Sequence, residues 1–77
     1  MRISIEEIRR LVRDEKVKEI WLVTSKYCEP CKIVKNMLKE EIESGKIKVV
    51  DVSTEDGRKI VDEFNIRVVP TVLILEK

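Results

Sequence analysis

The sequence predicts an α/β protein in which helices and strands alternate along a chain of 77 residues. A continuous apolar run at residues 20–23, "IWLV", is typical of a strand that is buried on both faces. Segments with helical spacing separate this run from two later apolar runs. A strand, a helix and a strand in succession form a right-handed unit with parallel strands. The predicted order is therefore helix, strand, helix, strand, helix, strand in a single domain, residues 1–77.

The first helix is predicted from residue 4 to residue 15 or 16. Ser4 is a suitable N-cap, and Glu7 three residues later completes a capping box. Ile3 and Ile8 have the spacing of a hydrophobic staple, a contact that fixes how the chain enters a helix. An apolar stripe at helical spacing is formed by Ile5, Ile8, Leu11 and Val12.

The strand around residues 18–25 leads into a helix predicted over residues 28–45. Pro30 is tolerated only in the first turn of a helix, so it places the helix start beside Cys28. Gly45 is a stop signal at the other end. One face of this helix is apolar and contains Cys31, Val34, Leu38 and Ile42.

Two more strands and a short helix complete the predicted order. Residues 46–53 form a strand centred near Val49 and Val50, and residues 53–64 form a helix capped by Ser53 or Thr54. The last strand, residues 67–77, is interrupted near its start by Pro70. Other residues expected in the core are Trp21, Ile60, Val61, Phe64 and Ile66.

Composition narrows the classes of function. The 16 basic and 15 acidic residues are balanced, which argues against a surface for nucleic acid or a membrane. No apolar run approaches the roughly 20 residues of a membrane span, and "MRISIEEIRR" is not a secretory signal, so we expect a cytoplasmic protein. Abundant Lys and Glu without Gln favour a thermophilic source. The chain has no His, the commonest metal ligand and general base.

The two cysteines, Cys28 and Cys31, are separated by two residues. Cys28 is expected at the amino end of a helix, where free N–H groups and the helix dipole stabilise a thiolate. Cys31 lies one turn further along the apolar face. A zinc site needs four ligands and would therefore need two chains, and a purely structural disulfide would close a trivial loop. The pattern favours thiol–disulfide exchange, with a redox-sensing binding module without turnover and a metal-bridged dimer as alternatives.

Two segments resemble the thioredoxin and glutaredoxin superfamily. "YCEPCK" resembles the thioredoxin active-site motif, and "FNIRVVPTVLIL" resembles the segment that contains the family's cis-proline. The resemblance covers about residues 17 to 75. It implies a truncated thioredoxin-like fold, an N-terminal helix followed by βαβαβ, without the family's last strand and helix.

The resemblance also implies an enzyme, a protein-disulfide reductase that needs no cofactor or metal. Cys28 would be the nucleophile, Cys31 the resolving thiol and Pro70 a cis-proline beside them. Disulfide-containing protein substrates would contact Tyr27, Glu29, Pro30, Val69 and Thr71, and an unidentified reductase would recharge the dithiol. Glutathione binding is not expected, because the chain ends before the Gly-Gly turn that glutaredoxins use.

The sequence departs from the family at four places. Leu22 stands where thioredoxins have a buried Asp that accepts a proton, and Val49 or Val50 stands where they have a Lys. Glu29 is expected to raise the pKa of Cys28, which favours a reductant over an oxidant. The missing last strand would leave residues 71–75 as a bare sheet edge.

The bare edge raises the question of what covers the truncated fold. In thioredoxins, the helix before the first strand packs on the face of the sheet opposite to the cysteine helix. We expect either that the N-terminal helix relocates, or that a second copy covers the gap in a homodimer through strand 71–75.

Overall fold

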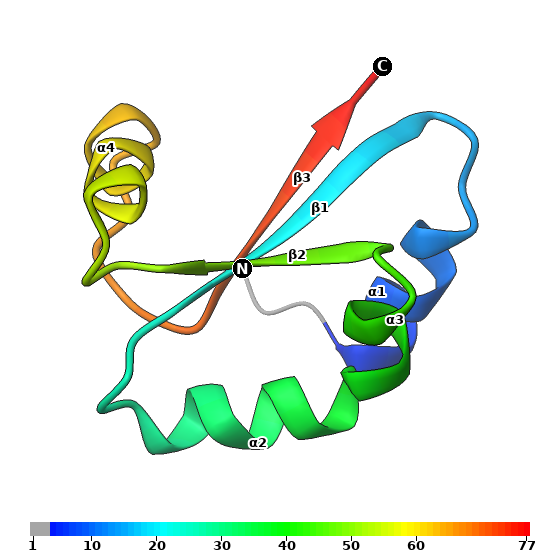
Figure 1. Ribbon diagram of the computed structural model, residues 1–77. Helices are drawn as coiled ribbons and strands as arrows, with labels where there is room; N and C mark the ends of the chain where they lie inside the picture. The colour runs from blue at the N-terminus through cyan, green and yellow to red at the C-terminus, as the bar shows by residue number, and fades with distance from the viewer. Residues whose placement is uncertain (1–3) are drawn as a thin grey trace.

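The computed structural model describes residues 4–77 and confirms the predicted alternation of helices and strands (Figure 1). Its elements, in chain order, are α1 (Ile5–Val12), β1 (Val17–Thr24), α2 (Glu29–Met37), α3 (Lys39–Glu43), β2 (Ile47–Asp51), α4 (Glu55–Glu63) and β3 (Thr71–Glu76). The predicted order of strands and helices is therefore present, with one helix more than predicted.

The three strands form one mixed sheet in the order β2-β1-β3. The central strand β1 pairs in parallel with β2 and antiparallel with β3, so that Leu22 lies between Val49 and Val72. The parallel pair follows from the helical crossover between β1 and β2. Both parallel strands end at the edge of the sheet where the chain enters "SKYCEPC".

The prediction of one helix over residues 28–45 is wrong in one respect, because this segment is divided at Leu38 into α2 and α3. Leu38 is fully buried and has φ −105° and ψ 19°, outside the helical range. Arg9 of α1 donates a hydrogen bond to the main-chain oxygen of Met37 at 3.0 Å and pairs with Glu41 at 3.4 Å. The break thus lies where Arg9 of α1 caps the last carbonyl of α2. The local sequence does not show this contact, because the two residues are far apart in the chain.

The N-terminal helix relocates, which was one of the two expectations. Ile8 of α1 packs in the core cluster with Leu38, on the face of the sheet that α2 covers. The other members of this cluster are Ile20, Leu22 and Ile47. The helix ends at Val12, earlier than predicted, and its N-cap Ser4 accepts a hydrogen bond from the N–H of Glu7 at 3.1 Å. The predicted contact of Ile3 with Ile8 lies outside the described residues.

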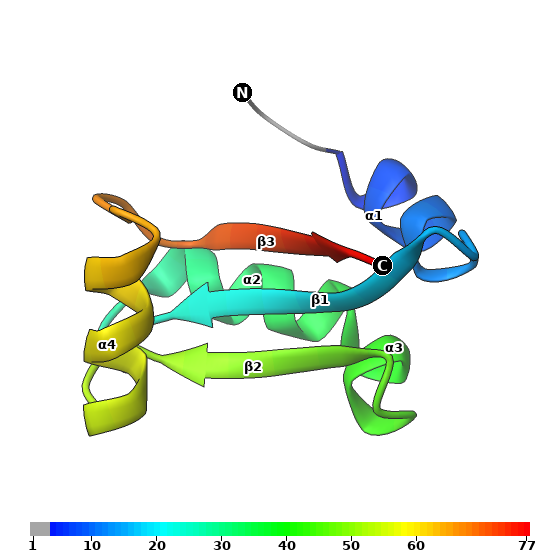
Figure 2. The same ribbon diagram turned by 90° about the horizontal axis from the view of Figure 1, so that it is seen from above.

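Within residues 4–77, α4 is the one helix on the opposite face of the sheet, and it lies at the carboxyl ends of the parallel strands β1 and β2 (Figure 2). Thr54, not Ser53, caps this helix by accepting a hydrogen bond from the N–H of Gly57 at 2.9 Å. Gly57 packs so closely on β2 that a Cβ atom there would lie within van der Waals overlap of the Asp51 main-chain oxygen. Val23 and Val50 are buried at this end of the sheet.

Beyond α4, no other helix within residues 4–77 covers this face of the sheet. Phe64 is 40% exposed, so the prediction that it belongs to the core is wrong. It follows the last turn of α4 and reaches Trp21 only edge-on, with ring centroids 6.5 Å apart. Trp21 and Ile66, also predicted to be core residues, are half-buried. The reason is that α4 lies at one end of the strands and leaves the rest of this face uncovered (Figure 2).

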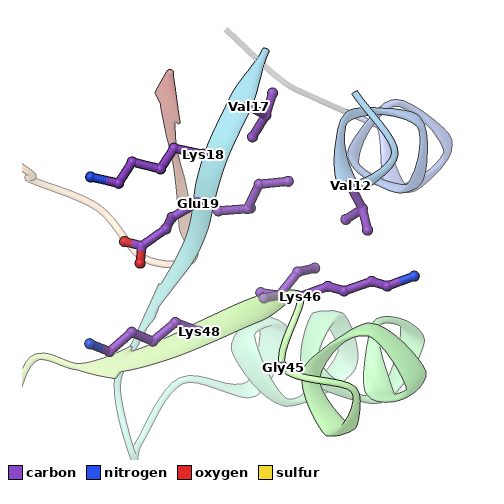
Figure 3. A pocket seen from close by; sticks show the side chains of 9 residues that line it. Val12, Val17, Lys18, Glu19, Gly45, Lys46 and Lys48 are labelled. Carbon is purple, nitrogen blue, oxygen red and sulfur yellow. The ribbon is translucent and has the colours of Figure 1, made fainter. Parts of the chain in front are cut away.

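A cavity of about 480 Å³ lies at the start of β1 and β2, at the far end of the sheet from the cysteines. A register irregularity between Val17 and Glu19 accompanies it. Figure 3 shows that Lys18 and Lys48 point to one side of the sheet whereas Lys46 points to the other. These ammonium groups do not converge, so the cavity is not organised around an anion.

Candidate active site

The loop after β1 delivers Cys28 to the amino end of α2, as the sequence predicts. Cys28 is the N-cap residue, with φ −103° and ψ 110°, and Pro30 lies in the first turn. The Sγ atom of Cys28 accepts a hydrogen bond from the N–H of Cys31 at 3.2 Å. A sulfur in this position is stabilised as an anion by a free N–H group and by the helix dipole.

The two cysteines differ in accessibility. They form a disulfide, and their Cα atoms are 5.2 Å apart. Cys31 is fully buried on the apolar face of α2, whereas Cys28 is half-buried. A thiol that attacks another disulfide must be reachable, and the second thiol needs to reach only the first. Cys28 is therefore the more accessible of the two residues.

The loop before β3 closes over the cysteines. The Val69–Pro70 peptide bond is cis, and the Val69 main-chain oxygen lies 3.8 Å from the Sγ of Cys28. The Thr71 hydroxyl donates a hydrogen bond to the main-chain oxygen of Val68, so this side chain is engaged within the loop. Residues far apart in sequence, Cys28, Cys31, Val69 and Pro70, are thus neighbours.

The rim of the site is exposed and partly apolar. Tyr27 is 92% exposed, so it does not pack locally and remains available for contact with a partner. Glu29 and Pro30 are also exposed. Val68, which the sequence did not single out, is 71% exposed in the loop beside Val69. An apolar residue directly before a Val-Pro pair is the only sequence signal for it.

The negative charge of Glu29, between the two cysteines, is partly compensated. Glu29 forms an ion pair with Lys32 at 3.1 Å, so its effect on the Cys28 thiolate is partly offset. Leu22 is fully buried on the face that α2 covers, and places no carboxylate there.

Asp51, a residue missed in the sequence, ends β2 opposite Thr24. Hydrogen bonds from the side chain and main chain of Ser53 hold the pKa of Asp51 below its usual value, with help from Lys26 and Lys35 and against a small cost of burial. Asp51 therefore stays ionised over the neutral range. Asp51 lies at the carboxyl end of β2, and the neighbouring strand β1 leads to Cys28. This position is the sequence signal that could have pointed to Asp51.

Neither a metal site nor a membrane span is seen in the part of the chain that is described. Among residues 4–77, no three Cys, Asp or Glu side chains gather closely enough to hold a metal ion. The helices within the same residues are too short and too polar to cross a bilayer.

Comparison with known proteins gives a consistent result. The thioredoxin family model matches residues 3–77. Thioredoxin 1 of Nostoc sp. is 35% identical over 52 residues, which are 65% of this chain and 49% of that protein. Thioredoxin of Porphyra purpurea is 40% identical over 53 residues, again 65% and 49% of the two chains. The chain spans about half the length of these curated relatives.

Two solved structures share the fold. Oxidized thioredoxin O1 of Arabidopsis thaliana matches with a TM-score of 0.59 and 19% identity, over 95% of this chain and 71% of that one. Thioredoxin of Trypanosoma brucei brucei matches with a TM-score of 0.57 and 26% identity, over 95% and 65%. Because the family model covers nearly every residue and the cysteine pair lies at the start of α2, this chain belongs to the thioredoxin family.

Proposed function

We propose that the protein is a thiol–disulfide oxidoreductase, a protein-disulfide reductase that uses Cys28 and Cys31 as its redox couple. The single observation that carries the proposal is the position of the Cys28 sulfur. It belongs to a half-buried residue, accepts a hydrogen bond from the Cys31 N–H at 3.2 Å and lies 3.8 Å from the Val69 oxygen. These are the requirements for a nucleophilic thiolate beside a main-chain group that can hold a substrate.

The reaction proceeds in two exchanges. The Cys28 thiolate attacks one sulfur of the substrate disulfide, forms a mixed disulfide and releases the other substrate sulfur as a thiolate, which takes up a proton. Cys31 then loses its proton and attacks the Cys28 sulfur, which re-forms the Cys28–Cys31 disulfide and frees the second substrate thiol. The protein gives up two electrons and the substrate gains two.

Substrate contacts are assigned to the residues around the accessible sulfur. The main chain of Val69 would pair with the substrate as an added strand, while Tyr27 and Pro30 form an exposed surface beside it. Glu29 and Thr71 border the same position. Pro70 shapes the loop that brings Val69 to Cys28.

The remaining parts of the assignment stay predictions. They are a single functional domain over residues 1–77, disulfide-containing proteins as substrates, an unidentified reductase that recharges the dithiol, a reducing direction, a cytoplasmic location, a thermophilic source and a homodimer through strand 71–75. A redox-sensing module without turnover and a metal-bridged dimer are the alternatives that the test must separate.

The test is catalysed reduction of a protein disulfide with a chemical dithiol as electron source. We expect the parent to accelerate the reaction, Cys28→Ser to be inactive, and Cys31→Ser to accumulate a mixed disulfide that mass spectrometry detects. A parent no faster than the dithiol alone would favour the sensing module. Zinc retained at one ion per two chains would favour the metal-bridged dimer.

A further inference from the structure

Lys35 differs in burial from the neighbouring lysines of α2 and α3. It is half-buried, whereas the side chains of Lys32 and Lys39 are 58% and 67% exposed. Those two lysines pair with Glu29 and Glu43, but Lys35 forms no ion pair at contact distance within residues 4–77. The positive charge of Lys35 therefore lies close to the protein surface without a direct partner.

Lys35 follows Cys31 by four positions on α2. Residues four apart on a helix are neighbours, with about 5–6 Å between their Cβ atoms. A helical side chain also leans toward the amino end of the helix, so it covers the turn before its own Cα atom. The side chain of Lys35 therefore leads back toward Cys31, whose sulfur is fully buried.

Asp51 lies at the end of the sheet where α2 begins. Figure 1 shows that α2 runs back along the sheet, opposite in direction to β1 and β2, so its amino end lies at the carboxyl ends of these strands. Side chains alternate along a strand. Asp51 is therefore on the same face as Ile47, which packs in the core cluster with Leu38 on the side that α2 covers.

The charges around Asp51 support this placement. Two hydrogen bonds from Ser53 are the main cause of the lowered pKa of Asp51, and the positive charges of Lys26 and Lys35 lower it further. Lys26 belongs to the loop after β1, and Lys35 belongs to α2. The carboxylate of Asp51 thus attracts the ammonium group of Lys35 toward the amino end of α2, which is also the direction of Cys31.

Within residues 4–77, the other elements beside Cys31 present uncharged residues. β1 presents Leu22 and Thr24, which are both buried, and the loop before β3 presents Val69 and Pro70. The exposed ion pair in the first turn of α2 has no net charge. The charged groups left to act on the buried sulfur are Lys26, Lys35 and Asp51.

We infer that the ammonium group of Lys35 stabilises the Cys31 thiolate during the second exchange, with Asp51 as the residue that positions Lys35. The inference rests on the proposed function and assigns a charge partner to its second step. A positive charge near a thiol lowers the pKa of that thiol. Lys35 thus offsets part of the effect of burial on Cys31, in a chain where Leu22 replaces the proton-accepting Asp of thioredoxins.

The exchange that Lys35 assists involves one thiol and one mixed disulfide. Cys31 gives up its proton to water, and its thiolate attacks the Cys28 sulfur. A bond forms between the two cysteine sulfurs, the bond from Cys28 to the substrate breaks, and the substrate sulfur leaves with the electron pair and takes up a proton. Cys28 carries no charge in the mixed disulfide, so at this stage Cys31 is the thiol of the pair that Lys35 can stabilise.

The test uses dithiodipyridine, a neutral disulfide whose thiopyridone product absorbs in the ultraviolet. Cys28 of the reduced protein releases the first thiopyridone at a rate that depends on the reagent concentration. Cys31 releases the second in a first-order phase, which stopped-flow absorbance resolves. The dependence of this second phase on pH gives the pKa of Cys31 in the mixed disulfide.

Lys35→Gln should raise the pH at which the second phase reaches half its maximum, and should slow this phase about three- to tenfold at neutral pH. The maximum at high pH should stay unchanged, because the geometry of attack is retained. Lys35→Arg keeps the charge and should behave like the parent. Lys39→Gln removes a charge of the same sign from the exposed start of α3 and should change neither phase.

A titration that needs no exchange reaction measures the same effect. In the Cys28→Ser background, the ultraviolet absorbance of the Cys31 thiolate should appear at higher pH when Lys35→Gln is added. In the Asp51→Asn background, the effect of Lys35→Gln should be smaller, because Lys35 is no longer attracted toward the amino end of α2. The titrations in the Cys28→Ser background provide the test even if Asp51→Asn folds poorly.

An unchanged pKa of Cys31 in Lys35→Gln would overturn the inference, and so would a Lys35→Arg variant that behaves like Lys35→Gln. A lower maximum of the second phase with the same pKa would also overturn it, because Lys35 would then act on the structure and not through its charge. An equal effect of Lys35→Gln with and without Asp51 would reject the positioning role of Asp51. No release of thiopyridone by the parent would defeat the proposed function itself, while the titrations of Cys31 would still test Lys35.

Discussion

The Sγ atom of Cys28 lies 3.8 Å from the main-chain oxygen of Val69, across 41 positions of sequence. This contact joins the helix that begins beside Cys28 to the loop that precedes β3. In the proposed reaction, a substrate held by the Val69 main chain would therefore lie next to the attacking sulfur. Changes to either segment should alter the redox chemistry, whereas changes elsewhere should act through stability.

The charges on the first turn of α2 should tune the Cys28 thiol. We expect Glu29→Ala to lower the pKa of Cys28, because it removes a negative charge beside the thiolate. Lys32→Ala should raise it, because Lys32 lies 3.1 Å from Glu29 and offsets its charge. The measurement is the ultraviolet absorbance of the thiolate against pH. Lys39→Ala, in the exposed pair with Glu43 on α3, is the matched control and should change nothing.

The same pair should set the reduction potential. A less stable thiolate favours the disulfide, so we expect Glu29→Ala to make the couple more oxidising than the parent. Equilibration with a thiol buffer of known potential measures this change. If the potential moves the other way, the prediction that Glu29 favours a reducing couple is wrong.

The second exchange should depend on pH in a simple way. Leu22 is fully buried where thioredoxins have a proton-accepting Asp, and Cys31 is fully buried as well. Burial disfavours a thiolate, so the rate at which Cys31 resolves a mixed disulfide should rise with pH to above the ordinary thiol pKa of about 8.5. Stopped-flow decay of a preformed mixed disulfide on Cys28 measures it. An inflection below neutral pH would reveal a carboxylate base, which Asp51→Asn and Glu29→Gln would then identify.

Arg9 should hold the relocated helix α1 in place. Its side chain pairs with the largely buried Glu41 at 3.4 Å and caps the Met37 carbonyl at 3.0 Å. Arg9→Met would leave the Glu41 carboxylate, one of whose oxygens already has no partner, buried and unpaired. We expect a loss of about 1–3 kcal/mol of unfolding free energy in urea titrations. Arg10→Met, at an exposed position on the same helix, should stay within about 0.5 kcal/mol of the parent.

The two glycines should differ in their tolerance to alanine. A Cβ at Gly57 would overlap the Asp51 main-chain oxygen, so Gly57→Ala must displace α4 from β2 and should cost about 3 kcal/mol. Gly45 has a φ of 81° and open space around it, so Gly45→Ala should cost about 1–2 kcal/mol through the left-handed backbone alone. Similar losses for both variants in chemical denaturation would show that α4 does not pack as closely as described.

Asp51 should contribute to stability in a pH-dependent way. Its folded-state pKa is lowered, chiefly by hydrogen bonds from Ser53, so its stabilisation is present above the unfolded-state value of about 3.9 and is lost as pH falls through the lower folded value. Asp51→Asn should remove this acid-dependent part, so that the parent and the variant converge at the lowest pH. Ser53→Ala should remove only part of it, because the main-chain N–H of Ser53 still donates. Urea denaturation at several acidic pH values measures the difference.

The sequence by itself determined the order of the strands and the main helices, and where the two sulfurs lie. Pro30 fixed the start of α2 beside Cys28, and "IWLV" fixed a buried central strand, because each restricts the local backbone or its burial strongly. The spacing of Cys28 and Cys31 placed one sulfur at the helix end and the other on the apolar face. These are short-range constraints, and the described structure agrees with them except at Trp21, which is half-buried on the face beyond α4.

The tertiary structure decided where those elements meet. α1 packs on the same face as α2, Leu38 interrupts the predicted helix, and Phe64 is left exposed beside Trp21. An amphipathic helix shows that one side must be buried but not against which partner, because the apolar stripe is compatible with either face of a sheet. The hydrogen bond from Arg9 to the main-chain oxygen of Met37 joins α1 to the end of α2. These residues are 28 positions apart, so only the folded chain brings them together.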